Sequence, residues 1–197
     1  MDPANALWIG GPQGSGKTSL ARALGARFGL QLYHVDARTG AHEDRMPATE
    51  LASLTTTDEH ADPATMLARF VTTSRHRFRL VLEDLRALPD EPGCVVEGTQ
   101  LFPTSVSAVL SSPDHALFLA PDLDALRRRL SAGGPIEGTS GRDLLIAQAF
   151  ETEARELRLP TLRVDRPLDE VIEAAAEAFE PAVERLRRAS AAGGTSR

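Results

Sequence analysis

Lysine is nearly absent from this chain. Of its 22 basic residues, 21 are arginine and one, Lys17, is lysine. A coding bias against lysine explains the scarcity, and under such a bias a surviving lysine marks a position that arginine fills poorly. An ammonium is a compact charge, whereas a guanidinium is larger and planar. Lys17 is therefore the first candidate for a functional residue.

Cysteine, positive net charge and long apolar runs are also scarce or missing. The one cysteine, Cys94, excludes a disulfide within the chain and a cysteine-based zinc cluster. A net charge of −6 argues against general nucleic-acid binding. No apolar run reaches the roughly 18 residues of a membrane span, and residues 1–5 lack the basic and apolar parts of a secretion signal. We expect a cytoplasmic protein with no membrane or nucleic-acid partner.

Length and periodicity predict one α/β domain, placed at 1–190, with a disordered tail at 191–197. Short apolar or alternating runs predict strands at 6–9, 30–35, 94–96, 115–119 and 161–164. Apolar residues three and four apart predict helices at 17–28, 63–88, from Thr104, after Asp122, at 142–157 and at 168–189. The last helix is expected to bend near Pro181. Residues 37–62 are polar and poorly periodic, with a surface loop expected at 55–60, and a mobile loop is expected at 131–141. Alternating strands and helices predict a parallel sheet covered on both faces.

Residues 11–18, GPQGSGKT, match the pattern G-x-x-x-x-G-K-[ST] between the first expected strand and the first expected helix. Glycines let successive backbone N–H groups turn toward phosphate oxygens, and the helix that follows adds its positive end. Lys17 is predicted to reach the β- and γ-phosphates, and Thr18 to supply a hydroxyl to Mg²⁺. The predicted nucleotide-binding residues are Gly11, Gln13, Gly14, Ser15, Gly16, Lys17, Thr18 and Ser19.

Two acidic residues follow expected strands. Asp36 comes after the second strand and Glu97 after the third. Ligands of open α/β sheets bind outside the carboxyl ends of the strands, so both residues are candidates for the site. The alternatives are that Asp36 caps the next turn and that Glu97 is an ordinary carboxylate at a strand end.

In the order and spacing of these elements the chain resembles the small P-loop kinases of the nucleoside-monophosphate-kinase-like group, which includes adenylate kinase, shikimate kinase and chloramphenicol phosphotransferase. The resemblance implies a three-layer fold with strand order 2-3-1-4-5, and ATP and Mg²⁺ as cofactors. It implies that Asp36 orients or deprotonates the acceptor and that Glu97, where many relatives have aspartate, holds Mg²⁺ with Thr18 or contacts the acceptor. It also implies a lid at about 127–142, whose Arg129 and Arg142 reach the transferred phosphoryl group. A solvated helix face is the alternative for these arginines.

The resemblance further places acceptor binding in a helical region at about 37–92. Within it Ser74 falls on the apolar face of an expected helix, flanked by Arg75 and Arg77. These three residues, with Asp36 and Glu97, are the predicted acceptor-binding residues. Surface arginines beside a tolerated buried serine are an equally good interpretation.

The expected function is transfer of the γ-phosphoryl group of ATP to a hydroxyl or phosphate of a small molecule. A nucleoside monophosphate kinase and a regulatory nucleotide-binding protein without turnover remain alternatives. A GTPase is excluded, because its Asn-Lys-x-Asp motif needs a second lysine and the one asparagine is Asn5. The identity of the acceptor and the choice between a monomer and a homodimer stay open.

Overall fold

The computed structural model of the chain describes residues 1–55, 61–132 and 139–193. A five-stranded sheet lies at its centre in the order β2-β3-β1-β4-β5, and every neighbouring pair is parallel. The strands are β1 (Leu7–Gly10), β2 (Gln31–His34), β3 (Cys94–Gly98), β4 (Ala116–Ala120) and β5 (Thr161–Arg163). The sheet and its strand order confirm the expectation from the sequence.

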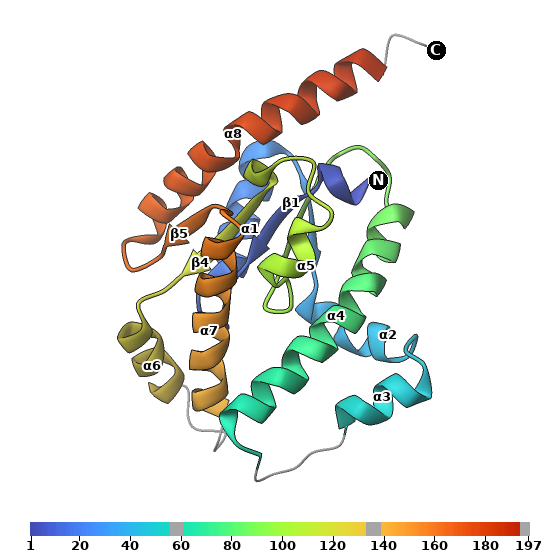
Figure 1. Ribbon diagram of the computed structural model, residues 1–197. Coiled ribbons are helices and arrows are strands. Elements are labelled where there is room, and N and C mark those ends of the chain that lie inside the picture. Colours follow the sequence, from blue (N-terminus) through green and yellow to red (C-terminus); the bar gives the residue numbers. More distant parts are fainter. Residues whose placement is uncertain (56–60, 133–138, 194–197) are drawn as a thin grey trace.

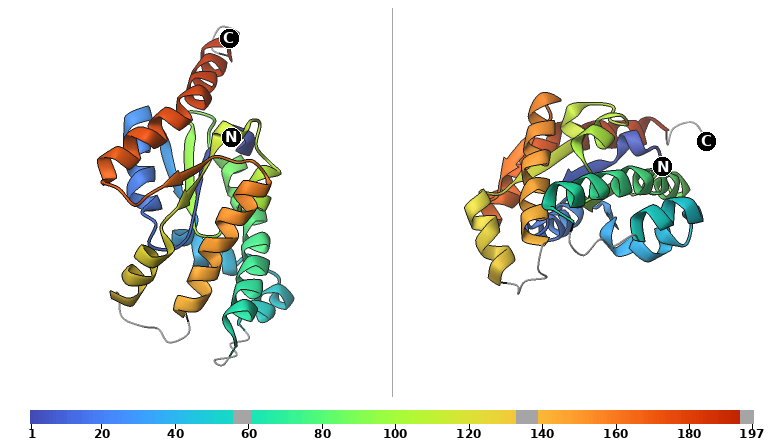
Figure 2. Two further views of the ribbon diagram at one scale, coloured as in Figure 1. Left: turned by 60° about the vertical axis from the view of Figure 1, so that its left-hand side comes forward. Right: turned by 60° about the horizontal axis from the view of Figure 1, so that its bottom comes forward.

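Helices cover both faces of this sheet (Figures 1 and 2). On one face lie α1 (Lys17–Phe28) and α8 (Leu168–Gly193), and on the other lie α4 (Pro63–Ala87), α5 (Pro103–Ser107) and α7 (Thr139–Glu156). In β1, Leu7 and Ile9 belong to the core on the α1 and α8 side, whereas Trp8 belongs to the core on the α4 and α7 side. Burial on both faces is the reason that β1 is apolar throughout.

Capping residues define two of the predicted helix starts. Asp62 accepts hydrogen bonds from Ala64 N (2.9 Å) and Thr65 N (3.1 Å), and Pro63 occupies the first position of α4. Asp122 accepts from Ala125 N at 2.9 Å, ahead of α6 (Leu123–Ala132). Both helices begin where the sequence predicts, because a side-chain cap is a local signal.

The segment between β2 and α4 contains η2 (Asp36–Arg38), α2 (Thr39–Glu43) and α3 (Ala48–Thr55). The resemblance implied a helical region at about 37–92, but the residue pattern before Asp62 predicted no individual element. These elements have one to two turns, which is too short for apolar periodicity to reveal them. The surface loop expected at 55–60 lies outside the described residues apart from Thr55, the last residue of α3. Both ends of the loop expected at 131–141 are helical, because α6 continues to Ala132 and α7 begins at Thr139. The residues between them, 133–138, lie outside the described residues.

The last helix is longer than expected. It ends at Gly193 rather than 189, with Pro181 inside it, and residues 194–197 of the expected tail lie outside the described part. The remaining elements are the short 3-10 turns η1 (Pro3–Asn5) and η3 (Pro113–His115). None of the helices in the described ranges combines the length and apolar character needed to cross a membrane.

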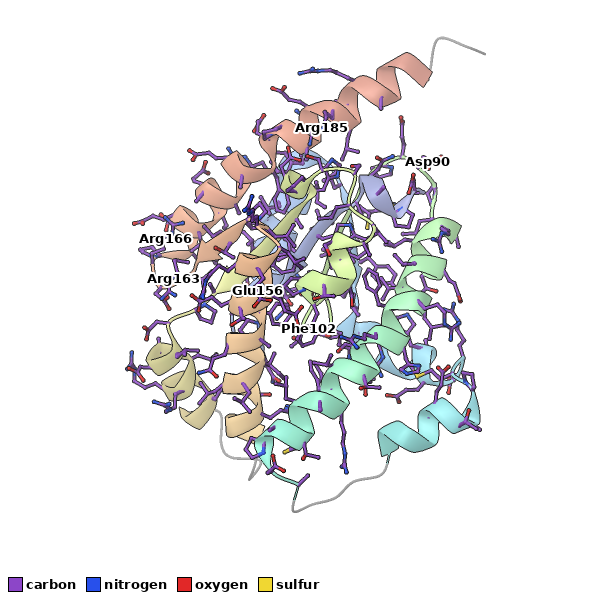
Figure 3. All side chains as sticks on the ribbon, in the orientation of Figure 1. Asp90, Phe102, Glu156, Arg163, Arg166 and Arg185 are labelled. Atoms are coloured by element: carbon purple, nitrogen blue, oxygen red, sulfur yellow. The ribbon has the colours of Figure 1, made fainter. Side chains whose placement is uncertain are left out.

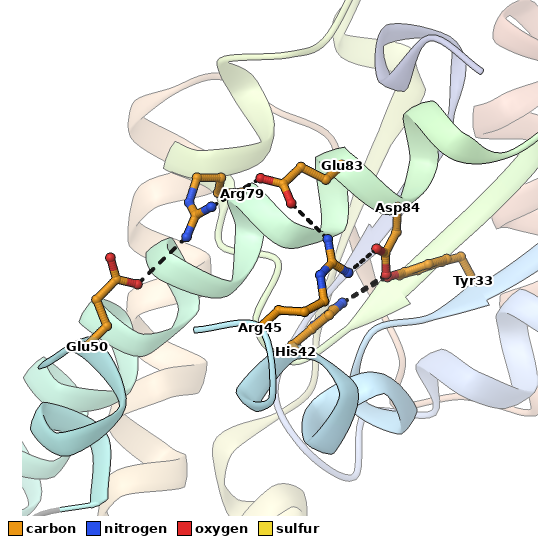
Figure 4. A network of polar contacts seen from close by, with 7 residues as sticks. All are labelled: Tyr33, His42, Arg45, Glu50, Arg79, Glu83 and Asp84. Atoms are coloured by element: carbon orange, nitrogen blue, oxygen red, sulfur yellow. Dashed lines mark hydrogen bonds and ion pairs between the residues drawn. The ribbon is translucent and has the colours of Figure 1, made fainter. Parts of the chain in front are cut away.

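A polar network ties α2 and the residues after it to β2 and α4 (Figure 4). At its centre, Asp84 accepts a hydrogen bond from Tyr33 Oη (2.5 Å), contacts His42 Nε2 (3.1 Å) and pairs with Arg45. Arg45 also pairs with Glu83 at 2.8 Å. Burial opposes the ionisation of Asp84, but these hydrogen bonds outweigh it and hold the pKa of Asp84 below its usual range. The network fixes the segment that follows β2 against the body of the domain.

Candidate functional site

The turn between β1 and α1 has the conformation that anion binding requires. Gly14 and Gly16 have φ angles of 74° and 87°, in the left-handed region where glycine is free of strain. Gly16 is also the N-cap of α1, and no side chain caps that end of the helix. The first N–H groups of α1 can therefore donate to an anion.

Lys17 is buried at the start of α1, with 6% of its surface exposed, and its Nζ donates to Pro12 O at 2.9 Å. Burial lowers the pKa of Lys17, and the nearby carboxylates of Asp36 and Glu97 oppose that shift. The ammonium is thus held inside the glycine-rich turn, close to two carboxylates and with one carbonyl as its hydrogen-bond partner.

Thr18 and Glu97 meet beside this ammonium because β1 and β3 are neighbours in the sheet. Thr18 Oγ1 donates to Glu97 Oε1 at 3.0 Å, and His34 Nδ1, from the strand on the other side of β3, lies 2.5 Å from the same oxygen. Glu97 is 2% exposed, and its second oxygen, Oε2, is buried without a hydrogen-bond partner.

A hydroxyl and a carboxylate with an unpaired oxygen are hard oxygen donors of the kind that Mg²⁺ takes. Among the described residues, no group of three or more His, Cys, Asp or Glu could hold a metal ion by itself. Mg²⁺ usually keeps several waters and is bound through one or two protein ligands plus phosphate oxygens. Thr18 and Glu97 therefore fit a magnesium site that is completed by a nucleotide.

Asp36 follows β2 at the same edge of the sheet and is exposed. Its Oδ2 accepts hydrogen bonds from Thr99 N (3.2 Å) and Thr99 Oγ1 (3.3 Å), on the loop after β3. The bond within its own turn is made by its backbone instead, since Thr39 Oγ1 donates to Asp36 O at 2.8 Å. The carboxylate is therefore oriented across the sheet edge, and capping of the next turn does not account for it.

One cavity of about 400 Å³ joins these groups. Lys17, Thr18, Asp36 and Arg142, which the sequence predicts as site residues, all line it. The complete lining consists of Gln13, Gly14, Lys17, Thr18, Asp36, Thr39, Phe70, Thr99, Gln100, Arg142, Asp143 and Ile146. The cavity lies beside the carboxyl ends of β1, β2 and β3, where ligands of open α/β sheets bind.

Arg142 enters the cavity from α7. Its Nε and Nη2 both donate to Asp143 Oδ1, at 2.9 and 2.7 Å, and its guanidinium lies 5.8 Å from the centre of the Phe70 ring. Arg129 belongs to α6, but its side chain lies outside the described residues. Arg127 pairs with Asp124 on the exposed face of the same helix.

The residues predicted to bind the acceptor from α4 are absent from the lining of the cavity. Ser74 is buried and its Oγ donates to Phe70 O at 2.7 Å, within the helix. Arg75 is exposed. Arg77 is buried and donates to Glu43 Oε1 (2.8 Å) and Thr39 Oγ1 (3.2 Å), so it reaches the cavity only through Thr39.

Sequence reasoning missed half of the lining, namely Thr39, Phe70, Thr99, Gln100, Asp143 and Ile146. Thr99 and Gln100 come directly after β3. They could have been predicted, like Asp36 and Glu97, from the rule that ligands bind beyond the carboxyl ends of the strands. Asp143 follows Arg142 in sequence and could have been proposed as its partner. Phe70 and Ile146 carry no signal beyond that of ordinary core residues.

A second hollow of about 640 Å³ lies near the ends of β4 and β5 and is lined by Asp122, Arg163, Asp165 and Arg166. Arg163 and Arg166 project from the region of β5 (Figure 3). Asp165 accepts hydrogen bonds from Asp122 N at 2.6 Å and from Arg163 Nη2 at 3.2 Å. These polar groups border the same edge of the sheet as the glycine-rich turn.

Solved structures share this fold, although no family model and no curated protein matches the sequence. TT1252 from Thermus thermophilus is 22% identical, with a TM-score of 0.54 over 89% of this chain and 96% of that one. A deoxyadenosine kinase from M. mycoides with bound dATP is 12% identical, with a TM-score of 0.52 over 89% and 99%. A sugar kinase from Janibacter sp. HTCC2649 is 19% identical, with a TM-score of 0.51 over 90% and 96%. The chain therefore has the fold of the small P-loop kinases, as expected from the sequence.

Proposed function

We propose that this chain uses Mg²⁺ to transfer the γ-phosphoryl group of ATP to a hydroxyl group of a small molecule. The observation that carries the proposal is the meeting of Lys17, Thr18 and Asp36 in one cavity, with the buried carboxylate of Glu97 bonded to Thr18. The kinases among the similar structures support it, and one of them contains bound dATP.

The glycine-rich turn and Lys17 would bind the phosphates. N–H groups around residues 13–18 donate to phosphate oxygens, and Lys17 Nζ exchanges its bond to Pro12 O for a bond to phosphate. When bound at Thr18 and Glu97, Mg²⁺ neutralises charge on the transferring phosphate. Catalysis of phosphoryl transfer consists mainly of such positioning and charge neutralisation, which suits a preformed polar cavity.

Asp36 would accept the proton of the acceptor hydroxyl. The acceptor oxygen attacks the γ-phosphorus, the bond from that phosphorus to the β–γ bridging oxygen breaks, and ADP leaves with that oxygen. The proton of the acceptor hydroxyl passes to the Asp36 carboxylate, which Thr99 holds in place. Arg142 and Arg129 remain the predicted cations for the transferring phosphoryl group, and the pair with Asp143 fixes the orientation of Arg142.

The test is release of ADP and formation of phosphorylated product from ATP, Mg²⁺ and a panel of hydroxyl compounds. Asp36→Asn should lower kcat by about 10²- to 10⁴-fold while nucleotide affinity changes little. Asp44→Asn removes an exposed carboxylate a few residues away and should leave kcat near the wild-type value.

Two results would count against the proposal. If Asp36→Asn weakens ATP binding as much as turnover, Asp36 supports the nucleotide site rather than the acceptor. If the wild-type protein binds ATP but phosphorylates none of the compounds, the alternative of a nucleotide-binding protein without turnover is favoured.

A further inference from the structure

The acceptor half of the cavity is defined here as the part of its lining that comes from outside the glycine-rich turn and α1. It is formed by Asp36, Thr39, Phe70, Thr99, Gln100, Arg142, Asp143 and Ile146. If ATP occupies the turn, this half is where the acceptor binds. The acceptor should therefore be complementary to its charges, hydrogen-bonding groups and apolar surface.

Positive charge in this half is already balanced. Arg142 is its one cation among the described lining residues, and two nitrogens of that guanidinium are bonded to the buried carboxylate of Asp143. Asp36 adds a second carboxylate. Behind the lining, Arg77 donates through Nη2 to Glu43 and through Nη1 to Thr39, and its buried Nε has no hydrogen-bond partner. With Lys17 engaged by nucleotide phosphate, an anionic acceptor would meet two carboxylates and one guanidinium, and would have to compete with Asp143 for Arg142.

The hydroxyls of Thr39 and Thr99 already donate within the protein, and this half also holds hydrogen-bond acceptors. Asp36 and Asp143 contribute carboxylate oxygens, and Gln100 is 8% exposed with its Oε1 lacking a partner. A buried acceptor without a partner costs free energy that a donor on a ligand recovers. Hydroxyl and amino groups are such donors, whereas carboxylate and phosphate groups of a ligand are not.

Apolar surface forms the remaining wall. Phe70 and Ile146 lie beside the polar groups, and Phe70 is partly exposed, with its ring 6.0 Å from Phe102 and in edge-on contact with it. An apolar wall opposite a few polar groups is the usual construction of a small-molecule site, and it suits the face of a ring.

We propose that the acceptor is a ring-shaped alcohol rich in hydroxyl or amino groups and without negative charge. This inference rests on the proposed kinase function and narrows it, because it disfavours sugar acids and nucleoside monophosphates as acceptors. Asp143 is then a specificity-determining residue, since its carboxylate balances the one guanidinium that could otherwise hold an anionic acceptor.

The test compares compounds that differ mainly in one anionic group. The pairs are D-glucose with D-glucuronate, methyl shikimate with shikimate, and adenosine with adenosine monophosphate, and D-glucosamine is the cationic member. Initial rates of product formation give kcat/KM for each compound. In the pairs that react, the uncharged member should be preferred by about tenfold or more, which is the effect of about 1.4 kcal/mol. Preference for the anionic member in those pairs overturns the inference.

Asp143→Asn tests the charge balance directly. The substitution keeps an oxygen acceptor for Arg142 but removes the negative charge, so the preference for uncharged over anionic compounds should shrink by about tenfold. Asp124→Asn removes a carboxylate paired with Arg127 on the exposed face of α6 and should leave the preference unchanged. An unchanged preference in a folded Asp143→Asn protein overturns the role of Asp143.

Equilibrium binding separates this inference from the proposed function. Thermal shifts of the wild-type protein are measured with each compound in the presence of ADP and Mg²⁺. If no compound is phosphorylated, the kinase proposal fails, but larger shifts with the uncharged members still support the charge preference of the cavity. Larger shifts with the anionic members, or no shift with any compound, overturn it.

Discussion

Lys17→Met should stabilise the ligand-free protein while it abolishes most activity. The lysine is 6% exposed, and its ammonium has one hydrogen bond, to Pro12 O. Methionine has a similar length and no charge, so it fills the same space without the polar head. The substitution therefore separates what Lys17 costs the fold from what it contributes to catalysis.

The structure sets the direction of the stability effect. Removing an ammonium from water costs several kcal/mol, and a hydrogen bond to a charged group returns about 1.5–3 kcal/mol. Asp36 and Glu97 attract the ammonium, yet the pKa of Lys17 is lowered, so burial outweighs that attraction. We expect a gain of about 1 kcal/mol for the variant, which corresponds to about 2–4 °C in Tm for a domain of this size.

The effect on activity should be large and opposite. One preorganised donor is lost from the transition state, which costs about 2.7–4 kcal/mol, or 10²- to 10³-fold in kcat. Arg22→Met is the matched control, because Arg22 is an exposed cation on the same helix. It should change the free energy of unfolding by no more than about 0.5 kcal/mol and leave kcat unaltered.

The assay is differential scanning calorimetry without nucleotide, together with steady-state kinetics. The pH dependence supplies a further check. Between the lowered pKa of folded Lys17 and its ordinary value of 10.5, the unfolded chain binds more protons, so wild-type stability rises with pH in that window. The advantage of Lys17→Met should therefore shrink toward pH 10.5. A variant that melts below the wild-type protein, or that retains turnover, refutes the reasoning.

Three further substitutions test the metal site and the network around Asp84. Glu97→Gln should raise the Mg²⁺ concentration needed for half-maximal activity by about tenfold or more, measured by titrating Mg²⁺ at fixed ATP. Asp84→Ala should cost about 2–4 kcal/mol in urea unfolding, because three hydrogen-bonded partners lose their acceptor. His42→Gln should make the free energy of unfolding depend less on pH below pH 6.5. Burial lowers the pKa of His42 in spite of its bond to Asp84. The unfolded chain therefore takes up this proton first as pH falls, which destabilises the wild-type protein but not the variant.

Each of these expectations has its own control. ATP affinity without Mg²⁺ should be nearly the same in Glu97→Gln, and an equal loss there would place Glu97 outside the metal site. Glu83→Ala removes the exposed partner of Arg45 and should cost no more than about 1 kcal/mol, so equal costs at Glu83 and Asp84 would contradict the central position of Asp84. His115 also has a lowered pKa and contributes to the same pH dependence. The contribution of His42 is therefore the difference in pH dependence between the variant and the wild-type protein.

The glycine-rich turn and the two carboxylates were predictable because their signals are local. The pattern at residues 11–18 specifies a backbone conformation through its own glycines, and a strand ending in Asp36 or Glu97 places the residue at a known edge of a parallel sheet. The helix starts at Asp62 and Asp122 were equally local. By contrast, the helices between β2 and α4 depend on contacts with residues distant in sequence, such as that of Arg45 with Asp84.

The sequence by itself determined the fold class, the order of the elements and the place of a phosphate-binding turn around the one lysine. Only the tertiary structure decided which side chains share the cavity with that lysine. Ser74, on the apolar face of α4, and the flanking Arg75 and Arg77 were predicted to bind the acceptor. The α4 residue in the lining is instead Phe70, one turn before Ser74, and Arg77 is held by Glu43. Which groups meet, and whether a charge such as Arg142 is already paired, depends on packing between distant segments, and no local pattern encodes that.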